Sequence, residues 1–141
     1  MGVTISAKNS SYNFDMGYGG FFSLRCNIAK AFDKEFGEHY ETLMFRHSED
    51  DFKAFDERAN EILSASRFKD EDADILDFLF ESDCEGKISH RTCKKIYELI
   101  KNIDFAGKIF TYAAYSDGND YEYFKEFLKE CYSHRRKMYW G

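Results

Sequence analysis

The chain of 141 residues contains no proline. Because proline often marks turns and helix ends, glycine and side-chain caps must end the secondary structure here. No apolar run approaches the roughly 20 residues that a membrane-spanning helix needs. The first residues also lack the basic region and apolar stretch of a secretory signal. These absences predict a cytoplasmic protein with no membrane segment.

Basic charge is scarce as well, since 20 Lys and Arg stand against 26 Asp and Glu for a net charge of −6. A protein that binds nucleic acid directly needs a basic face to neutralise phosphates, so this balance argues against one. The four cysteines, Cys26, Cys84, Cys93 and Cys131, are too few and too far apart for a secreted disulfide scaffold. We interpret them as free, mostly buried thiols.

Aromatic side chains are abundant, with 15 Phe and 10 Tyr in a chain that is 43% hydrophobic. That apolar content is enough to offset the entropy lost on ordering, and the length suits one globular domain over residues 1–141. Residues 2–8 alternate apolar and polar as a short strand does. The predicted fold class is α+β, predominantly helical, with about five helices and short terminal β-strands.

Five segments carry apolar residues at steps of three and four, which places them on one helical face. The first runs from Phe21 to Phe36, with Gly37 as its C-terminal break. The others begin after a capping box at Ser48, at Asp70 or Asp72, at Ser89, and after a turn at 116–119. Phe52 and Phe55 lie on the stripe that the second segment is expected to bury, and Phe80 lies on that of the third. The stripe of the last segment comprises Tyr121, Phe124, Phe127, Leu128 and Cys131. Residues 103–115 lack a clean period and are left as strand or helix. Trp140 is expected to lie against the first strand.

Residues 81–92 have the outline of an EF-hand between two helices. With Gly86 at the turn position, Glu81, Asp83 and Glu85 occupy the first three ligand positions. The twelfth position needs a bidentate glutamate and holds Thr92 instead. We therefore predict a degenerate EF-hand-like helix-turn-helix that binds no metal.

No catalytic or cofactor site is predicted. Zinc is not favoured, because Cys93 and Cys131 fall on the apolar stripes of their helices and burial explains them. The four histidines, at positions 39, 47, 90 and 134, are scattered along the chain. Their spacing does not indicate a catalytic set of nucleophile, base and orienting group. The chain is therefore expected to bind rather than to catalyse.

Two segments stand out as binding sites. The first, the glycine turn with the helix start behind it, could cradle a phosphate on backbone N–H groups and stack a base on its aromatic rings. It comprises Gly17, Tyr18, Gly19, Gly20, Phe21, Phe22 and Arg25. The alternative interpretation is a purely structural turn into a helix, since no P-loop lysine is present.

The second segment is the acidic strip, residues 70–85, which contains no Lys or Arg. It could dock on a basic surface of a partner protein, or it could simply be a solvated face. The partner-binding candidates in it are Asp70, Asp72, Asp74, Asp77, Asp83 and Glu85.

Residues 2–9, 15–21 and 82–89, together with Trp140, resemble a family of small uncharacterised proteins from Firmicutes and their phages. The resemblance implies a bacterial or phage-infected bacterial cell and a phage counter-defence role. Two functions follow as hypotheses. One is a sponge that sequesters a nucleotide-type immune signal; the other is an acidic inhibitor that mimics nucleic acid and binds a nuclease or DNA-binding protein. Whether the chain forms a homo-oligomer is left open.

Overall fold

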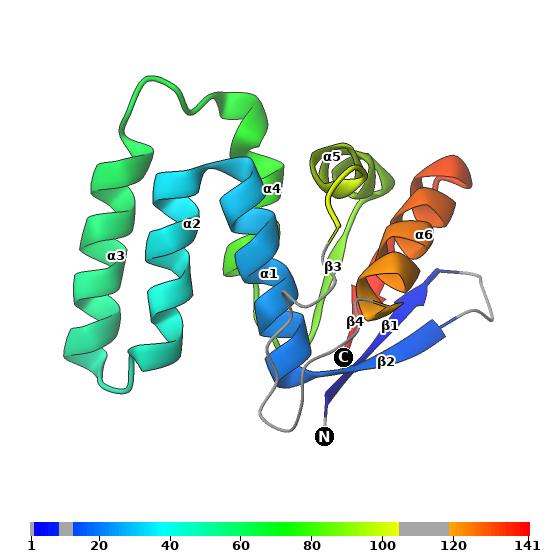
Figure 1. Cartoon of the computed structure of the whole chain (residues 1–141), viewed down its shortest axis with the longest axis horizontal. Coiled ribbons are helices and arrows are strands. Elements are labelled where there is room, and N and C mark those ends of the chain that lie inside the picture. Colours follow the sequence, from blue (N-terminus) through cyan, green and yellow to red (C-terminus); the bar gives the residue numbers. More distant parts are fainter. Residues whose placement is uncertain (1, 9–12, 105–118) are drawn as a thin grey trace.

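The computed structural model describes residues 2–8, 13–104 and 119–141 (Figure 1). The strands are β1 (Gly2–Ala7), β2 (Asn13–Gly17), β3 (Gly86–Ile88) and β4 (Met138–Trp140). The α-helices are α1 (Tyr18–Phe32), α2 (Lys34–Glu41), α3 (Glu49–Leu63), α4 (Ala73–Phe80), α5 (His90–Ile100) and α6 (Asn119–Ser133). Two 3-10 helices, η1 (Thr42–Phe45) and η2 (Asp70–Asp72), precede α3 and α4. The α+β, mainly helical class is confirmed, with six α-helices in the described residues rather than five.

The four strands form one antiparallel sheet in the order β2-β1-β4-β3. Its middle pair is β1 with β4, and Ile5 lies opposite Trp140, which confirms the expected position of that tryptophan. Gly86 of β3 pairs with Trp140 from the other side. A Cβ at Gly86 would lie 2.1 Å from the indole ring, so only glycine fits there. β2 lies in a stretch where the sequence pattern predicted no strand.

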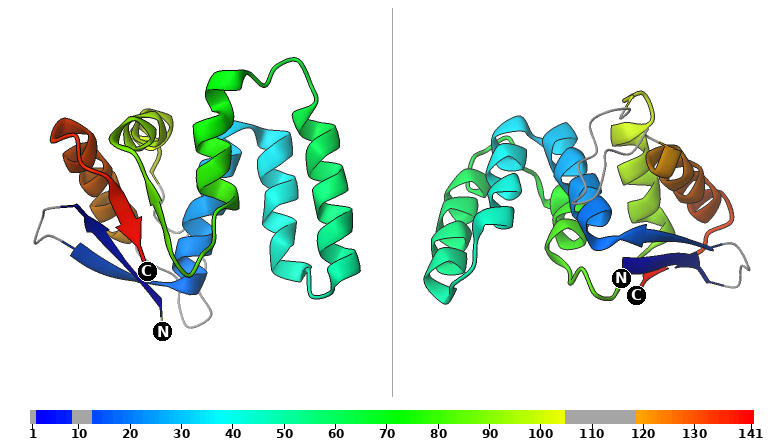
Figure 2. Two further views of the ribbon diagram at one scale, coloured as in Figure 1. Left: turned by 180° about the vertical axis from the view of Figure 1, so that it is seen from behind. Right: turned by 60° about the horizontal axis from the view of Figure 1, so that its bottom comes forward.

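The helices divide into two groups around α1. Helices α5 and α6 pack side by side against the sheet, whereas α2 and α3 lie on the far side of α1 (Figures 1 and 2). Helix α4 runs beside α1, and the segment 81–85 leads from its end to β3. None of the described helices has the length and apolarity to span a lipid bilayer.

The first predicted helix is two helices, because Asp33 takes an extended conformation between α1 and α2 (φ −159°, ψ 125°). Its carboxylate accepts from the Phe36 N–H at 2.9 Å and so caps α2. The prediction that Gly37 ends a helix is wrong, because this residue lies inside α2. A Cβ there would come within 2.4 Å of the Lys30 backbone, so this glycine allows α1 and α2 to approach closely.

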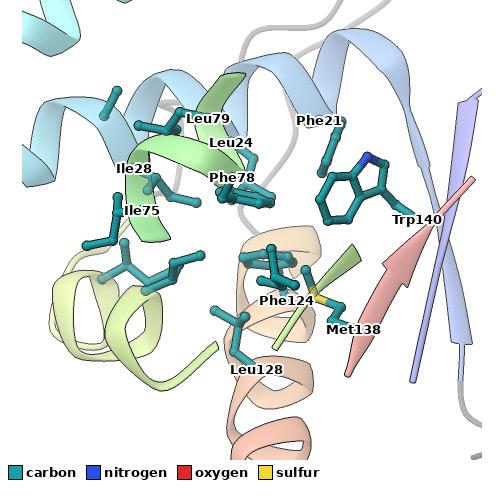
Figure 3. Packing of buried hydrophobic residues seen from close by; sticks show 14 of the residues in the cluster. Phe21, Leu24, Ile28, Ile75, Phe78, Leu79, Phe124, Leu128, Met138 and Trp140 are labelled. Carbon is teal, nitrogen blue, oxygen red and sulfur yellow. The ribbon is translucent and has the colours of Figure 1, made fainter. Parts of the chain in front are cut away.

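Buried apolar side chains from the sheet and the helices form one core (Figure 3). Phe21, Phe78 and Trp140 lie together in it, with ring centroids 6.3 Å apart for the two phenylalanines and 5.4 Å for Phe78 and Trp140. The stripe predicted for the last helix is confirmed as buried: Tyr121, Phe124, Phe127, Leu128 and Cys131.

Two predicted helix starts are confirmed by their caps. Ser48 Oγ accepts from the Asp51 N–H at 3.1 Å, and Ser89 Oγ accepts from the Thr92 N–H at 3.2 Å. Helices α4 and α5 with β3 between them give the helix-turn-helix outline of residues 81–92, in which Thr92 is buried. The part of the chain that the structure describes contains no cluster of three His, Cys, Asp or Glu able to hold a metal. Residues 105–118 lie outside the described residues. They include most of the segment 103–115, expected as strand or helix, and most of the turn predicted at 116–119.

Candidate binding groove

A groove of about 740 Å³ lies between α1, the α2–η1–α3 segment and the end of α4. One wall is a stripe of α1 in which every fourth residue faces the groove: Tyr18, Phe22, Cys26 and Lys30. Since an α-helix rises 1.5 Å per residue, this wall is about 18 Å long. The opposite wall is formed by side chains of α2, η1 and α3, and one end is closed by residues 79–83.

Large apolar side chains gather in this groove. The described residues contain six exposed large hydrophobic side chains, and four of them line it: Tyr18 (36% exposed), Met44 (45%), Phe52 (46%) and Phe80 (45%). A fifth, Phe45, follows Met44 directly on η1. Exposed apolar residues are ordinary when scattered singly, whereas a concentration in one hollow marks an interaction site.

Helical spacing had placed Phe52 and Phe80 on buried stripes, and the structure corrects both. Each belongs to an apolar helix face, but the groove leaves part of that face uncovered. In contrast, Phe55 on α3 is buried as predicted, because the ring of His39 stacks on it with centroids 4.4 Å apart.

Acidic side chains edge the groove on two sides. Glu41 and Asp56 come from α2 and α3, and Glu81 and Asp83 from the segment after α4. The described cations that line it are Lys30 and Arg25. Lys30 is ion-paired with Glu41, and Arg25 is only 4% exposed, so the groove presents a net negative edge around an apolar floor.

Arg25 joins α1 to the segment after α4 through hydrogen bonds to its main chain. Its Nη1 donates to the Glu81 carbonyl at 2.8 Å and its Nη2 to the Ser82 carbonyl at 3.4 Å. Burial lowers the pKa of this guanidinium, while Tyr40 and the nearby carboxylates oppose that shift. Three rings surround it at 4.6 to 5.4 Å: Phe21, Phe78 and Trp140. Its two Nη atoms thus donate to the main chain, and its Nε is buried without a hydrogen-bond partner in the part of the chain that the structure describes.

The other residues of the glycine turn are divided between groove and core. Gly17 is the N-cap of α1, without a side-chain cap, at φ −63° and ψ 152°. Tyr18, Gly19 and Phe22 line the groove, whereas Gly20 and Phe21 are buried. The predicted segment therefore contributes aromatic side chains to one wall of the groove.

The acidic strip is divided among three successive segments of the chain. Asp70 and Asp72 lie on η2, Asp74 and Asp77 on α4, and Asp83 and Glu85 beyond α4. Asp74 is paired with Lys95 of α5 at 2.9 Å, and Asp72 accepts from the Lys69 N–H at 2.9 Å. Among these six candidates only Asp83 lines the groove.

The groove offers little for proton transfer or nucleophilic attack. No histidine of the described residues lines it, and its thiol belongs to Cys26. Burial raises the pKa of that thiol to about 12, so it is protonated and a poor nucleophile near neutral pH. The groove provides apolar contact area and negatively charged carboxylates.

A second cleft of about 730 Å³ lies between η2, α4, α5 and the end of α6. Arg91, Lys94 and Arg135 line it together with Glu71 and Asp72, so its charge is mixed. None of the exposed large hydrophobic side chains of the described residues lies in it. It therefore lacks the exposed aromatic and methionine side chains that mark the groove.

Comparison with protein-family models, with curated proteins and with solved structures finds no match for the chain. The exposed apolar groove residues that the sequence pattern missed are Met44, Phe52 and Phe80. One signal was present in the sequence: Leu43, Met44 and Phe45 form an apolar run between two predicted helices, where no buried stripe accounts for them.

Proposed function

We propose that this chain is a non-enzymatic binding protein whose groove holds an apolar segment of a partner protein. The observation that carries the proposal is the gathering of Tyr18, Met44, Phe52 and Phe80 in one hollow, out of six exposed large apolar side chains in the described residues. Burying such side chains is the main favourable term in most protein association.

The acidic inhibitor was the second hypothesis from the sequence, with the acidic strip as its binding surface. Here the partner-binding surface is the groove instead. Binding of a nuclease or DNA-binding protein inside an infected bacterial cell remains the setting that the resemblance implies. Mimicry of nucleic acid is less favoured, because a row of phosphates has no counterpart in an apolar floor.

The nucleotide-sponge hypothesis has weaker support. A phosphate in the groove would share it with the carboxylates of Glu81 and Asp83, and Arg25 already bonds the main chain. Lys30, about three turns further along α1, is paired with Glu41. Repulsion by these carboxylates disfavours an anionic ligand.

The test is nuclear magnetic resonance mapping with a panel of short amphipathic peptides that share a Leu and Phe face. We expect the largest shifts at the groove residues, and about a tenfold loss of affinity in Phe52→Gln. The matched control is Tyr123→Gln, because Tyr123 is 55% exposed on α6, away from the groove.

Cyclic and ADP-ribose-type nucleotides form the second arm, measured by thermal shift. Stabilisation by a nucleotide with none by any peptide would replace the proposal with the sponge. Equal losses of peptide affinity in Phe52→Gln and Tyr123→Gln would also overturn it, because the binding would then not depend on the groove.

A further inference from the structure

We infer that the segment held in the groove is a basic amphipathic helix of about three turns, a deduction that rests on the proposed function. The apolar stripe of that helix lies along the α1 wall, and its Lys or Arg residues reach the carboxylates on the two edges.

The shape of the groove selects a helix over an extended strand. The described residues that line it belong to α1, α2, η1, α3, α4 and the segment 81–83, and no strand edge is among them. An extended peptide would therefore bring unpaired N–H and C=O groups against aromatic rings, at a cost in desolvation. A helix bonds its own backbone and presents only side chains.

The length of the groove agrees with this assignment. Tyr18, Phe22, Cys26 and Lys30 project from successive turns of α1 along about 18 Å. A helix of about 12 residues covers the same distance, and its own apolar side chains at steps of three and four can lie between those of α1. Phe52 and Phe80 are positioned to contact it from the remaining sides.

The carboxylates that line the groove favour a partner with positively charged side chains. Within the described residues Asp56, Glu81 and Asp83 form no salt bridge, whereas Glu41 is paired with Lys30. Three carboxylates thus line the groove beside its apolar side chains, and the cation near Glu81 and Asp83, Arg25, is buried. Lys or Arg flanking an apolar stripe complements this arrangement, and Asp or Glu at those positions is repelled.

The experiment uses synthetic helices of about 14 residues with one apolar face and Lys, Gln or Glu at the flanking positions. Affinity for the full chain is measured by fluorescence anisotropy. We expect the Lys peptide to bind at least about tenfold more tightly than the Gln peptide, and the Glu peptide to bind weakest. This advantage of Lys should shrink as salt is raised from about 0.05 M to about 0.5 M, because the edges are exposed to solvent.

Variants locate the effect. Asp56→Asn and Asp83→Asn should each reduce the preference for the Lys peptide severalfold. Asp77→Asn removes the same charge from an exposed position of α4 outside the groove and should leave the preference unchanged. A Lys peptide with its apolar face scrambled serves as the control for attraction by the net charge of the chain.

Different results would overturn the basic helix and the groove as a binding site. Equal binding of the three peptides, with a loss in Phe52→Gln, overturns the basic helix and leaves the groove as the binding site. Equal effects of Asp77→Asn and Asp83→Asn, full binding of the scrambled peptide, or a bound peptide without helical signal also overturn it. If no peptide binds, the proposed function itself fails.

Discussion

Arg25 and Trp140 donate to the same main-chain oxygen, that of Ser82, at 3.4 Å and 2.8 Å. They lie on the first helix and the last strand, and the guanidinium carbon is 5.4 Å from the centre of the indole ring. Together they fasten the segment after α4 to α1 and to the middle of the sheet. That segment carries Glu81 and Asp83, so this shared acceptor fixes one acidic edge of the groove.

Arg25→Lys is expected to destabilise the chain by about 2 kcal/mol although it keeps the charge. An ammonium cannot reproduce the planar fork that reaches two carbonyls while lying between aromatic rings. Trp140→Phe loses one donor and leaves a void where the second ring of the indole packs on Gly86, so it should cost about 2–3 kcal/mol. Urea unfolding measures both free energies. Full stability of Arg25→Lys would show that the positive charge alone is needed.

Gly37→Ala should be destabilising by about 1–3 kcal/mol, even though alanine favours a helix by about 1 kcal/mol over glycine. The added methyl group would meet the Lys30 backbone and force α1 and α2 apart. Thermal unfolding provides the measurement. Gly17→Ala is the control, because no atom lies within 4 Å of a Cβ there, and its cost should stay below about 1 kcal/mol. A rise in stability on Gly37→Ala would contradict the close helix contact.

Asp33 gives the stability a dependence on acid pH. Arg67 donates to both of its oxygens, at 2.8 Å and 3.1 Å, and this holds the pKa of the carboxyl below its ordinary value. A folded-state pKa below the unfolded value of about 3.9 adds stability that is complete above the unfolded pKa. That stability is lost as the pH falls through the folded-state pKa.

Asp33→Asn should therefore cost about 1 kcal/mol at neutral pH and much less near pH 2, where the wild-type carboxyl is protonated. Asparagine can still cap α2, so the comparison isolates the charge. Urea unfolding at several pH values measures the difference. Glu35→Gln, which removes the other carboxylate bonded to Arg67, serves as the control and should cost less, because Glu35 is more exposed. A pH-independent cost of Asp33→Asn would contradict the assignment.

One thiol per native chain is expected to react rapidly with an aromatic disulfide reagent. Cys84 is exposed, whereas Cys26, Cys93 and Cys131 are buried. Burial also raises the pKa of Cys26 to about 12, which suppresses its thiolate. Thiol counting before and after denaturation should give one and then four. Cys84→Ser should abolish the fast phase, and a fast phase that survives this change would place a second thiol at the surface.

Helix starts could be predicted from the sequence because their chemistry is local. Ser48 and Ser89 each bond an N–H three residues away, and both boundaries were right. The break at Asp33 was missed because the apolar steps continue from Phe21 to Phe36, although Asp33 caps α2 locally through the Phe36 N–H. Its bond with Arg67, 34 residues later, has no local signal. Gly37 was misread for a similar reason, since the same residue suits a helix end and a helix crossing, and only the position of Lys30 distinguishes them.

The candidate site was predictable in part. Tyr18, Phe22 and Asp83 were singled out from the sequence and line the groove. Periodicity identified the apolar faces that carry Phe52 and Phe80, but it cannot say whether another element covers each position on such a face. Arg25 was named as a ligand-binding residue, and its bonds to the main chain could not be predicted, because the carbonyls belong to residues more than 50 positions away.

The pairing of β1 with β4 sets the order in which the molecule can be completed. Synthesis delivers β1 first and β4 last among the described elements, so the sheet closes only after Met138 to Trp140 have left the ribosome. Contacts between such distant segments slow folding, because a long loop must close first. Trp140 then bonds Ser82 and sets the edge of the groove in the same event. The edge of the groove at residues 81–83 is thus held in place only once the strand that carries Trp140 has joined the sheet.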